Sequence, residues 1–478
     1  MPAIQKKGFS IGLVLFFIML FLPAPEGLSQ AGWMVAAVGV LMATWWGTEA
    51  LPVPVTALLP LALFPLLGVA DFKTTALPFS NPNIYLFLGG FILALGIENS
   101  GLHKRLALKM IIKVGTSGAR LVGGFMLVAA LLSMWVMNTS VTLMLLPIGL
   151  AVCGVVSSTI PDISPQEKKS FDNALLIGIA YAATIGGMST LIGTAPNIVF
   201  SAFMQETYGL TIGFIDWMKL GVPVAICMLF GAWYSLTKFI FPLNFTASLE
   251  TKLKLKTMLV ELGPMSKDES KVLIIFGLAA GSWIFRKVLI QIDFLSGLTD
   301  AGIAIIAAIL LFMTPLASRK GDLLSWDKTN KLPWGLLLLF GGGLTLAVQI
   351  NDRGLGVWIG QGLMILSSVP PLLIIFCVAT LIIFLTEITS NVATTSAFLP
   401  VIGAVAVAFD IAPISLTIPV VLAASCAFML PVATPPNAIV YGSGKFDIAT
   451  MMRAGFALNI IGMFVVTLFA YYLAPMIF

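Results

Sequence analysis

Charged residues are scarce in this chain of 478 residues. Asp, Glu, Lys and Arg together make up 10% of it, whereas 59% of the residues are apolar. A soluble domain carries about 25% charged residues. The net charge of +5 at pH 7 is too small and too dispersed to indicate a nucleic-acid partner. The composition therefore excludes a soluble enzyme and predicts an all-α polytopic membrane protein.

Groups that bind metals or act as nucleophiles are also few. We interpret the single histidine, His103, as a solvated residue at a membrane boundary because Lys104 and Arg105 follow it. The four cysteines lie inside apolar runs without the spacing of metal ligands, which predicts core positions. A membrane-embedded enzyme is the weakest functional hypothesis, since the spans contain no metal cluster and no nucleophile–base pair.

Long apolar runs dominate what remains. A bilayer core about 30 Å thick requires roughly 20 apolar residues per helical crossing. Divided at its charged and Pro- or Gly-rich breaks, the sequence predicts about eleven crossings, at residues 9–25, 31–48, 51–69, 83–102, 174–206, 216–241, 272–290, 300–317, 333–351, 414–442 and 454–477. The first run follows Lys6 and Lys7 and could be a signal peptide, but a retained helix gives the better distribution of charges.

Two apolar stretches, 121–160 and 369–409, do not fit one crossing each because polar residues interrupt them near the middle. The first contains Asn138, and the second contains a polar run from Glu387 to Thr395. Lipid tolerates irregular backbone only where protein encloses it or where it lines a wet cavity. We therefore predict two re-entrant hairpins with polar tips.

The basic residues support this topology. With a cytoplasmic N-terminus, eleven crossings and two hairpins, the outer side carries five of the 26 basic residues and the inner side carries the others, as the positive-inside rule requires. The five are Lys73, Lys219, Arg286, Lys287 and Arg353. We expect a multi-pass protein of the plasma membrane, the inner membrane in a bacterium, with its C-terminus outside.

The two hairpins align when the sequence is shifted by 253 positions. Asn138 then falls on Asn391, and a shift of 240 places the Thr-x-Pro-Asn motif at Thr194 on the motif at Thr434. Five crossings, an odd number, separate the paired asparagines, which predicts an inverted repeat with a binding site near the bilayer midplane. The predicted parts are the first transmembrane helix (1–30), the first repeat (31–248, hairpin 121–160), a cytoplasmic connection (249–271) and the inverted second repeat (272–478, hairpin 369–409).

The chemistry of the tips favours an anion together with small cations. A helix that restarts after each tip presents unpaired N–H groups and a partial positive charge. A proline in a helix leaves carbonyl groups of the preceding turn without a hydrogen-bond donor. These carbonyl groups, together with Asn and Thr oxygens, are suitable ligands for Na+. No Lys or Arg occurs in residues 121–167, 170–218 or 354–444. A bound dianion therefore needs at least two Na+ ions beside it, because an uncompensated charge in the membrane costs several kcal/mol.

The residues around the second Thr-x-Pro-Asn motif, at Thr434, resemble the signature of the divalent anion:sodium symporter family. They are Ser425, Phe428, Pro431, Thr434-Pro435-Pro436-Asn437 and Val440. The resemblance covers essentially the whole chain. The tips of that family carry Ser-Asn-Thr motifs, whereas the tips here read Met137-Asn138-Thr139 and Ser390-Asn391-Val392. Met137 and Val392 each replace a hydroxyl that could contact a carboxylate, a contact worth about 1 to 3 kcal/mol when buried.

The resemblance implies an eleven-helix homodimer in which a transport part moves against a scaffold part as an elevator. It implies one Na+ site at Ser133, Asn138 and the backbone around Met137 and Gly186. It implies a second Na+ site at Thr386, Thr389, Asn391 and Ala433. It implies that the substrate carboxylates contact Asn138, Thr139, Ser390, Asn391, Thr434 and Pro435.

The leading hypothesis is a secondary active transporter that couples Na+ influx to uptake of a C4-dicarboxylate such as succinate, malate or fumarate. Sulfate and citrate are further candidate substrates. One alternative is a Na+-independent dicarboxylate exchanger, which the missing basic residues disfavour, and another is an anion channel lined by the hairpins. Glu387, three residues before the second tip, either couples ions directly or supports the tip by hydrogen bonding.

Overall fold

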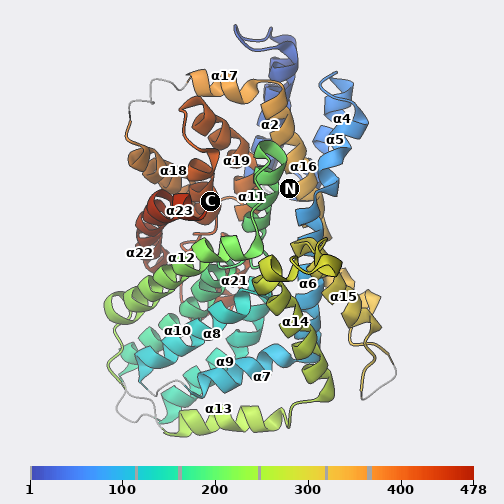
Figure 1. The fold of residues 1–478 in the computed structure, drawn as a ribbon. Helices are drawn as coiled ribbons and strands as arrows, with labels where there is room; N and C mark the ends of the chain where they lie inside the picture. The colour runs from blue at the N-terminus through green and yellow to red at the C-terminus, as the bar shows by residue number, and fades with distance from the viewer. Residues whose placement is uncertain (1–2, 114–116, 160–163, 246–248, 318–320, 363–368) are drawn as a thin grey trace.

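The computed structural model of the protein describes residues 3–113, 117–159, 164–245, 249–317, 321–362 and 369–478. Within these ranges the regular structure is helical. The β-pairing there is an isolated antiparallel bridge between Pro315 and Asp322. The prediction of an all-α chain is confirmed. Figure 1 shows the helices in two groups, with α7 to α10 and α13 at one end of the molecule and α2, α4, α16, α17 and α19 at the other.

The helices of the first half are α1 (Ala3–Phe21), α2 (Gln30–Thr48), α3 (Val53–Thr56), α4 (Leu59–Leu66), α5 (Phe72–Ala76), η1 (Leu77–Ser80), α6 (Pro82–Ser100), α7 (Leu102–Ile111), α8 (Gly118–Ser133), α9 (Asn138–Thr159), α10 (Pro165–Gly187), α11 (Ala195–Tyr208), α12 (Phe214–Tyr234), η2 (Ser235–Ile240) and α13 (Leu249–Glu261).

The helices of the second half are α14 (Lys267–Leu289), η3 (Asp293–Leu295), α15 (Asp300–Met313), η4 (Trp326–Lys331), α16 (Trp334–Asp352), α17 (Leu355–Gly362), α18 (Pro371–Thr386), α19 (Asn391–Ala408), α20 (Pro413–Ala424), α21 (Pro435–Tyr441), α22 (Ile448–Leu468), η6 (Phe469–Leu473) and α23 (Ala474–Ile477).

Eight helical segments of the described part are long and apolar enough to cross a membrane. They are Gln30–Thr48, Pro82–Ser100, Asn138–Ser158, Phe214–Ile240, Lys267–Leu289, Trp334–Asp352, Asn391–Ala408 and Ile448–Ile477. Shorter apolar helices lie at Val53–Leu66, Gly118–Ser133, Asp300–Met313, Pro371–Thr386 and Pro413–Ala424. The chain is therefore a multi-pass membrane protein, as its composition predicts.

Three of the predicted crossings are interrupted. The stretch 174–206 is divided where α10 ends at Gly187 and α11 begins at Ala195, and 414–442 is divided between α20 and α21. The stretch 51–69 contains the short helices α3 and α4 in place of one continuous helix. Prolines lie in the first turn of all four helices that restart, because proline lacks the N–H that a helix interior requires.

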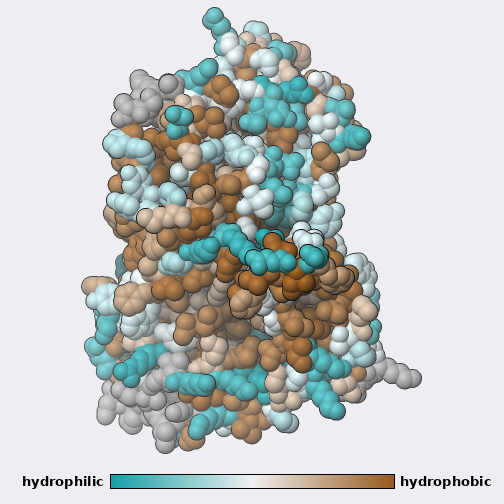
Figure 2. All heavy atoms as spheres, viewed as in Figure 1, coloured by the Kyte–Doolittle hydropathy of each residue, from teal (hydrophilic) through white to brown (hydrophobic). Residues whose placement is uncertain are grey.

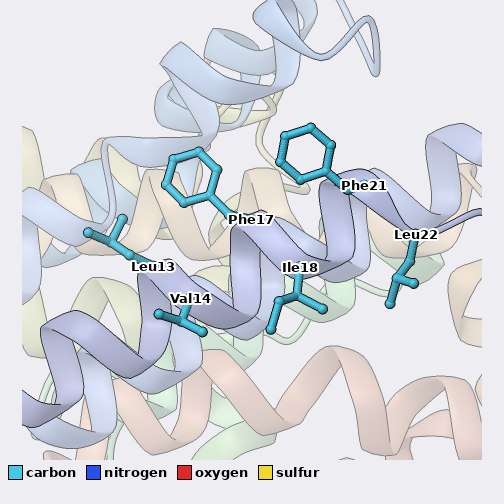
Figure 3. Close-up of a pocket in the computed structure, with 6 residues that line it drawn as sticks. All are labelled: Leu13, Val14, Phe17, Ile18, Phe21 and Leu22. Atoms are coloured by element: carbon cyan, nitrogen blue, oxygen red, sulfur yellow. The ribbon is translucent and has the colours of Figure 1, made fainter.

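Apolar side chains cover much of the molecular surface. From Ile11 onward the exposed residues of α1 are apolar, among them Val14, Phe17 and Phe21 (Figure 3), and the Phe21 side chain is 86% exposed. In Figure 2, hydrophobic side chains cover most of the lower part of the visible face, between a hydrophilic strip at mid-height and hydrophilic groups at the lower end. A lipid environment explains this exposure, which water would penalise.

The interpretation of His103 as a solvated residue is wrong. Its side chain is buried, and Nδ1 lies 3.1 Å from the carbonyl oxygen of Ile97. Burial lowers the pKa of His103 because it penalises the charged imidazolium. The neighbouring Arg105 is also buried, and it pairs with Glu269 at 2.7 Å while donating to three carbonyl groups between α13 and α14. These contacts fix α7 to the start of α14.

The helices around each polar interruption form a packed set, and the two sets meet at α21. α10 contacts α8, α9 and α21, while α20 contacts α18, α19 and α22. The hydroxyl of Tyr181 on α10 links the two sets, since it donates to the carbonyl oxygens of Phe428 at 2.7 Å and Met451 at 3.2 Å. A second group pairs α6 with α15, α1 with α2, and α16 with η1. The site described next lies between these two groups.

Candidate substrate and cation site

One cavity of about 620 Å³ collects residues from both polar interruptions and both helix breaks. Its lining comprises Glu49, Phe87, Phe91, Met137, Asn138, Thr139, Thr184, Gly193, Thr194, Ala195, Pro196, Pro333, Leu336, Ile388, Thr389, Ser390, Asn391, Val392, Val432, Ala433, Thr434, Pro435 and Pro436. All six residues expected to contact substrate are among them. Segments more than 250 positions apart therefore meet at one place.

The first interruption joins α8 to α9 through residues 134–137. Asn138 begins α9, and its side-chain Oδ1 accepts a hydrogen bond of 2.6 Å from the hydroxyl of Ser133, the last residue of α8. The backbone carbonyl of Asn138 accepts from the Thr142 hydroxyl at 2.8 Å. The N–H groups of the first turn of α9 have no acceptor within the helix, so they remain available at the cavity.

The second interruption repeats this arrangement between α18 and α19. Asn391 begins α19, its Oδ1 accepts from the Thr386 hydroxyl at 2.8 Å, and its carbonyl accepts from Thr395 at 2.8 Å. The hydroxyls of Thr389 and Thr394 share a hydrogen bond of 2.6 Å. Ser390 is the N-cap of α19 but makes no capping bond with its side chain, which leaves its hydroxyl for a ligand.

Each helix break is held by an asparagine of the Thr-x-Pro-Asn motif. The Asn197 amide donates to the carbonyl oxygens of Gly187 and Thr190, which spans the gap between α10 and α11. The Asn437 amide does the same between α20 and α21, with Ala427 and Leu430 as acceptors. Because each amide ties the start of its helix to the unwound segment before it, these segments are held in place beside the cavity.

The predicted cation ligands fall into two sets. Met137, Asn138, Thr389, Asn391 and Ala433 line the cavity. Ser133 and Thr386 lie behind the tips, fully buried, and reach the site through the asparagine side chains that they contact.

Gly186 is not brought to the cavity. It packs against the backbone of Ala130 on α8, where an added Cβ would lie 2.2 Å from a carbonyl oxygen, and its own carbonyl accepts from the backbone N–H of Ser189. Gly193 lines the cavity in its place.

Several lining residues were missed by the sequence analysis. Thr194 is the N-cap of α11, and its side chain makes no capping bond, unlike Thr434 in the other half. The shift of 240 positions that pairs Thr194 with Thr434 could have identified it. Phe87, Phe91 and Leu336 come from α6 and α16 and form an apolar wall that no motif indicates.

The electrostatics of the cavity come from backbone rather than from basic side chains. The lining contains no Lys, Arg or His among the described residues, and its charged member is the exposed Glu49 at the C-cap of α2. The N-termini of α9 and α19 supply first-turn N–H groups, whereas α11 and α21 have proline in the first turn and the Asn437 N–H already donates to Thr434 Oγ1. Such a site can hold carboxylates by hydrogen bonding, but the charge of a dianion needs mobile cations to balance it.

The sequence relationships agree with this geometry. Residues 5–478 match the family described as "Sodium:sulfate symporter transmembrane region". The chain therefore belongs to the sodium:sulfate symporter family, the divalent anion:sodium symporters, and the resemblance inferred from its motifs is confirmed. Its members are transporters, so the chain is a membrane transporter and not an enzyme.

Curated relatives align with nearly the whole chain. The chain is 40% identical over 475 residues to the "Sodium-dependent dicarboxylate transporter SdcS" of Staphylococcus saprophyticus, covering 98% of this chain and 92% of that protein. It is 39% identical over 479 residues to the protein of the same name from Staphylococcus aureus, covering 99% and 92%.

Two solved structures show the same fold at low sequence identity. The YdaH transporter of Alcanivorax borkumensis superposes with a TM-score of 0.52 at 14% identity, covering 98% of this chain and 96% of that chain. MtrF of Neisseria gonorrhoeae superposes with a TM-score of 0.60 at 13% identity, covering 99% and 96%.

Proposed function

We propose that the protein couples Na+ influx to uptake of a C4-dicarboxylate such as succinate, malate or fumarate. The observation that carries this proposal is the cavity itself, which joins both tips and both breaks and whose described lining has no basic side chain. Relatives at about 40% identity that are named sodium-dependent dicarboxylate transporters support the same pairing of ion and substrate.

Two Na+ sites follow from the paired hydrogen bonds at the tips. In each half a hydroxyl at a helix end meets the Oδ1 of the asparagine that starts the next helix, at 2.6 Å for Ser133 and 2.8 Å for Thr386. Two converging neutral oxygens of this kind are suitable ligands for Na+. We place one ion at Ser133, Asn138 and the backbone of Met137. The backbone of Gly193 lies beside this ion in the proposal. The second ion takes Thr386, Thr389, Asn391 and Ala433.

The substrate carboxylates lie between the tips in this proposal, in contact with Asn138, Thr139, Ser390, Asn391, Thr434 and Pro435. The free hydroxyl of Thr194 adds a further donor. Met137 and Val392 present apolar groups where a hydroxyl would stabilise another carboxylate. The chain thus supplies few polar contacts beyond those that two carboxylates use, which favours a C4-dicarboxylate over the tricarboxylate citrate.

The matching contacts of the two halves support an inverted repeat. Under this proposal, residues 1–30 form the first transmembrane helix, 31–248 and 272–478 form the two repeats, and 249–271 form a cytoplasmic connection. The α8–α9 and α18–α19 pairs are then re-entrant hairpins within 121–160 and 369–409. The N-terminus lies in the cytoplasm and the C-terminus outside, in agreement with the distribution of basic residues.

Transport by an elevator motion fits the position of the cavity. Its polar wall comes from α9, α11, α19 and α21, whereas the apolar residues Phe87 and Leu336 come from α6 and α16, and α11 and α19 pack against α16. Hydrogen bonds such as Ser140 to Glu98 at 2.8 Å cross between the groups and would separate as the transport part moves. The scaffold part then provides the contact for a homodimer.

Uptake of labelled succinate into proteoliposomes tests the function. We expect accumulation when Na+ is higher outside, a sigmoidal response to Na+, and competition by malate and fumarate that is stronger than competition by citrate or sulfate. Accumulation should stop when the Na+ gradient is dissipated. Flux at equal rates with and without that gradient would indicate an exchanger or a channel and would overturn the proposal.

A further inference from the structure

Glu387 occupies a buried position directly after α18 and does not hydrogen bond to its own tip. Its carboxylate accepts backbone N–H groups from Phe428 at 2.8 Å, from Met429 at 2.9 and 3.0 Å, and from Leu430 at 3.1 Å. It also accepts from the side-chain amide of Asn459 on α22 at 2.7 Å. These partners lie in the unwound segment between α20 and α21 and on the helix behind it.

The donors around Glu387 suit an ionised carboxylate. Every group that faces Glu387 in these bonds is an N–H donor, so a protonated acid would direct its O–H at donors without an acceptor. Three successive backbone N–H groups around one anion form a concave anion site. The N–H groups of residues 428–430 therefore bind a carboxyl group of the protein itself and are not free for substrate.

The other half of the molecule joins the same two positions without a charge. The shift of 253 places Met134 on Glu387, and the shift of 240 places Thr190 on Leu430. The Thr190 hydroxyl donates to the carbonyl oxygen of Met134 at 2.6 Å. The connection between tip and unwound segment is thus one hydroxyl hydrogen bond in the first half and a carboxyl group held by several N–H donors in the second.

The contacts of Leu430 carry the effect of Glu387 into the cavity wall. While its N–H binds Glu387, its carbonyl accepts from the backbone N–H of Ala433 at 3.2 Å and from the amide of Asn437 at 3.1 Å. Ala433 lines the cavity, and Asn437 holds the start of α21. Displacing Leu430 would therefore displace Ala433 in the cavity wall and the start of α21.

We propose that Glu387 is a positioning residue for the second Na+ site. It holds the α20–α21 break at a fixed distance from Asn391, and its buried negative charge raises the Na+ affinity of this site above that of the first. The proposal rests on the proposed Na+ coupling. The two halves then differ in charge, because Glu387 of the second half has Met134 as its counterpart in the first. The aligned hairpin motifs do not indicate this difference.

The test compares Glu387→Gln, Glu387→Asp and Asn459→Ala with the wild type, and uses Met134→Leu as the matched control at the corresponding position of the first half. Initial succinate uptake by proteoliposomes is measured against Na+ at saturating succinate, and against succinate at saturating Na+. We expect Glu387→Gln to need about tenfold more Na+ for half-maximal uptake, equivalent to about 1.4 kcal/mol. We expect the succinate KM to change little.

The other variants separate charge from packing. Glu387→Asp should recover most of the Na+ affinity, Asn459→Ala should shift it in the same direction as Glu387→Gln but less, and Met134→Leu should leave it unchanged. If Glu387→Gln does not fold, the Asn459→Ala and Glu387→Asp curves decide the question. Wild-type Na+ curves in all Glu387 and Asn459 variants would overturn the proposal. Wild-type uptake without any Na+ dependence would overturn the proposed function instead.

Discussion

Replacing Asn391 by alanine is expected to lower Na+-dependent succinate uptake by about 100-fold, and Asn138→Ala should have a similar effect. The Oδ1 of each asparagine accepts a hydrogen bond from a hydroxyl group. Each asparagine is also the first residue of a helix whose N-terminus faces the cavity. If the proposed site is right, alanine removes a cation ligand and a contact to the substrate together. The loss of two such interactions amounts to about 3 kcal/mol, which corresponds to about two orders of magnitude in rate or affinity.

The control for these variants is Asn351→Ala, which alters an exposed asparagine at the end of α16 outside the cavity. It should transport as the wild type does. Protein amount in the vesicles and the elution profile in detergent show whether Asn138→Ala and Asn391→Ala are folded. Wild-type uptake by both folded variants would contradict the assignment of the site, even though the membership of the family would stand.

Gly186→Ala is expected to destabilise the protein more than any other single methyl addition near the site. The added Cβ would lie 2.2 Å from the Ala130 carbonyl oxygen and 2.5 Å from its Cα, and these are backbone atoms that cannot rotate away. Overpacking of this kind costs about 1 to 3 kcal/mol or more. Because α10 contacts α8 along its length, we expect a melting temperature about 5 °C lower in Na+ and in K+ medium.

Gly154→Ala provides the matched comparison, since nothing lies within 4 Å of an added Cβ at this position of α9. Alanine also has a higher helix propensity than glycine. The melting temperature of Gly154→Ala should therefore equal or exceed that of the wild type. Equal stability of the two variants would show that Gly186 is not a packing contact and would favour its original interpretation as a backbone ligand of Na+.

The chemistry of the site was largely accessible from the sequence because polar residues in apolar runs have few structural explanations. Asn138, Asn391 and Thr434 could be identified from their repeated spacing, and the structure brings them to one cavity. The Thr-x-Pro-Asn motifs also indicated helix breaks, since proline cannot continue a helix. Local rules of this kind do not depend on which distant segments meet.

Other features depend on tertiary contacts and could not be predicted. Glu387 was recognised as unusual, but nothing in its neighbourhood indicates that it binds the backbone at 428–430. Gly186 packs on α8, whereas Gly193 lies in the unwound segment after α10 and lines the cavity, and the sequence around the two glycines does not indicate this difference. His103 looked solvated beside two basic residues, yet the packing around α7 buries it.

The central claim is that a dianion can occupy this cavity only together with Na+, because the described lining offers helix N-termini but no basic side chain. Equilibrium binding of labelled succinate to the purified protein tests it most directly, in NaCl, KCl and choline chloride at equal ionic strength. We predict saturable binding in NaCl, with an affinity that rises with about the second power of the Na+ concentration, and no measurable binding in the other two salts. The same dissociation constant in all three would contradict the claim.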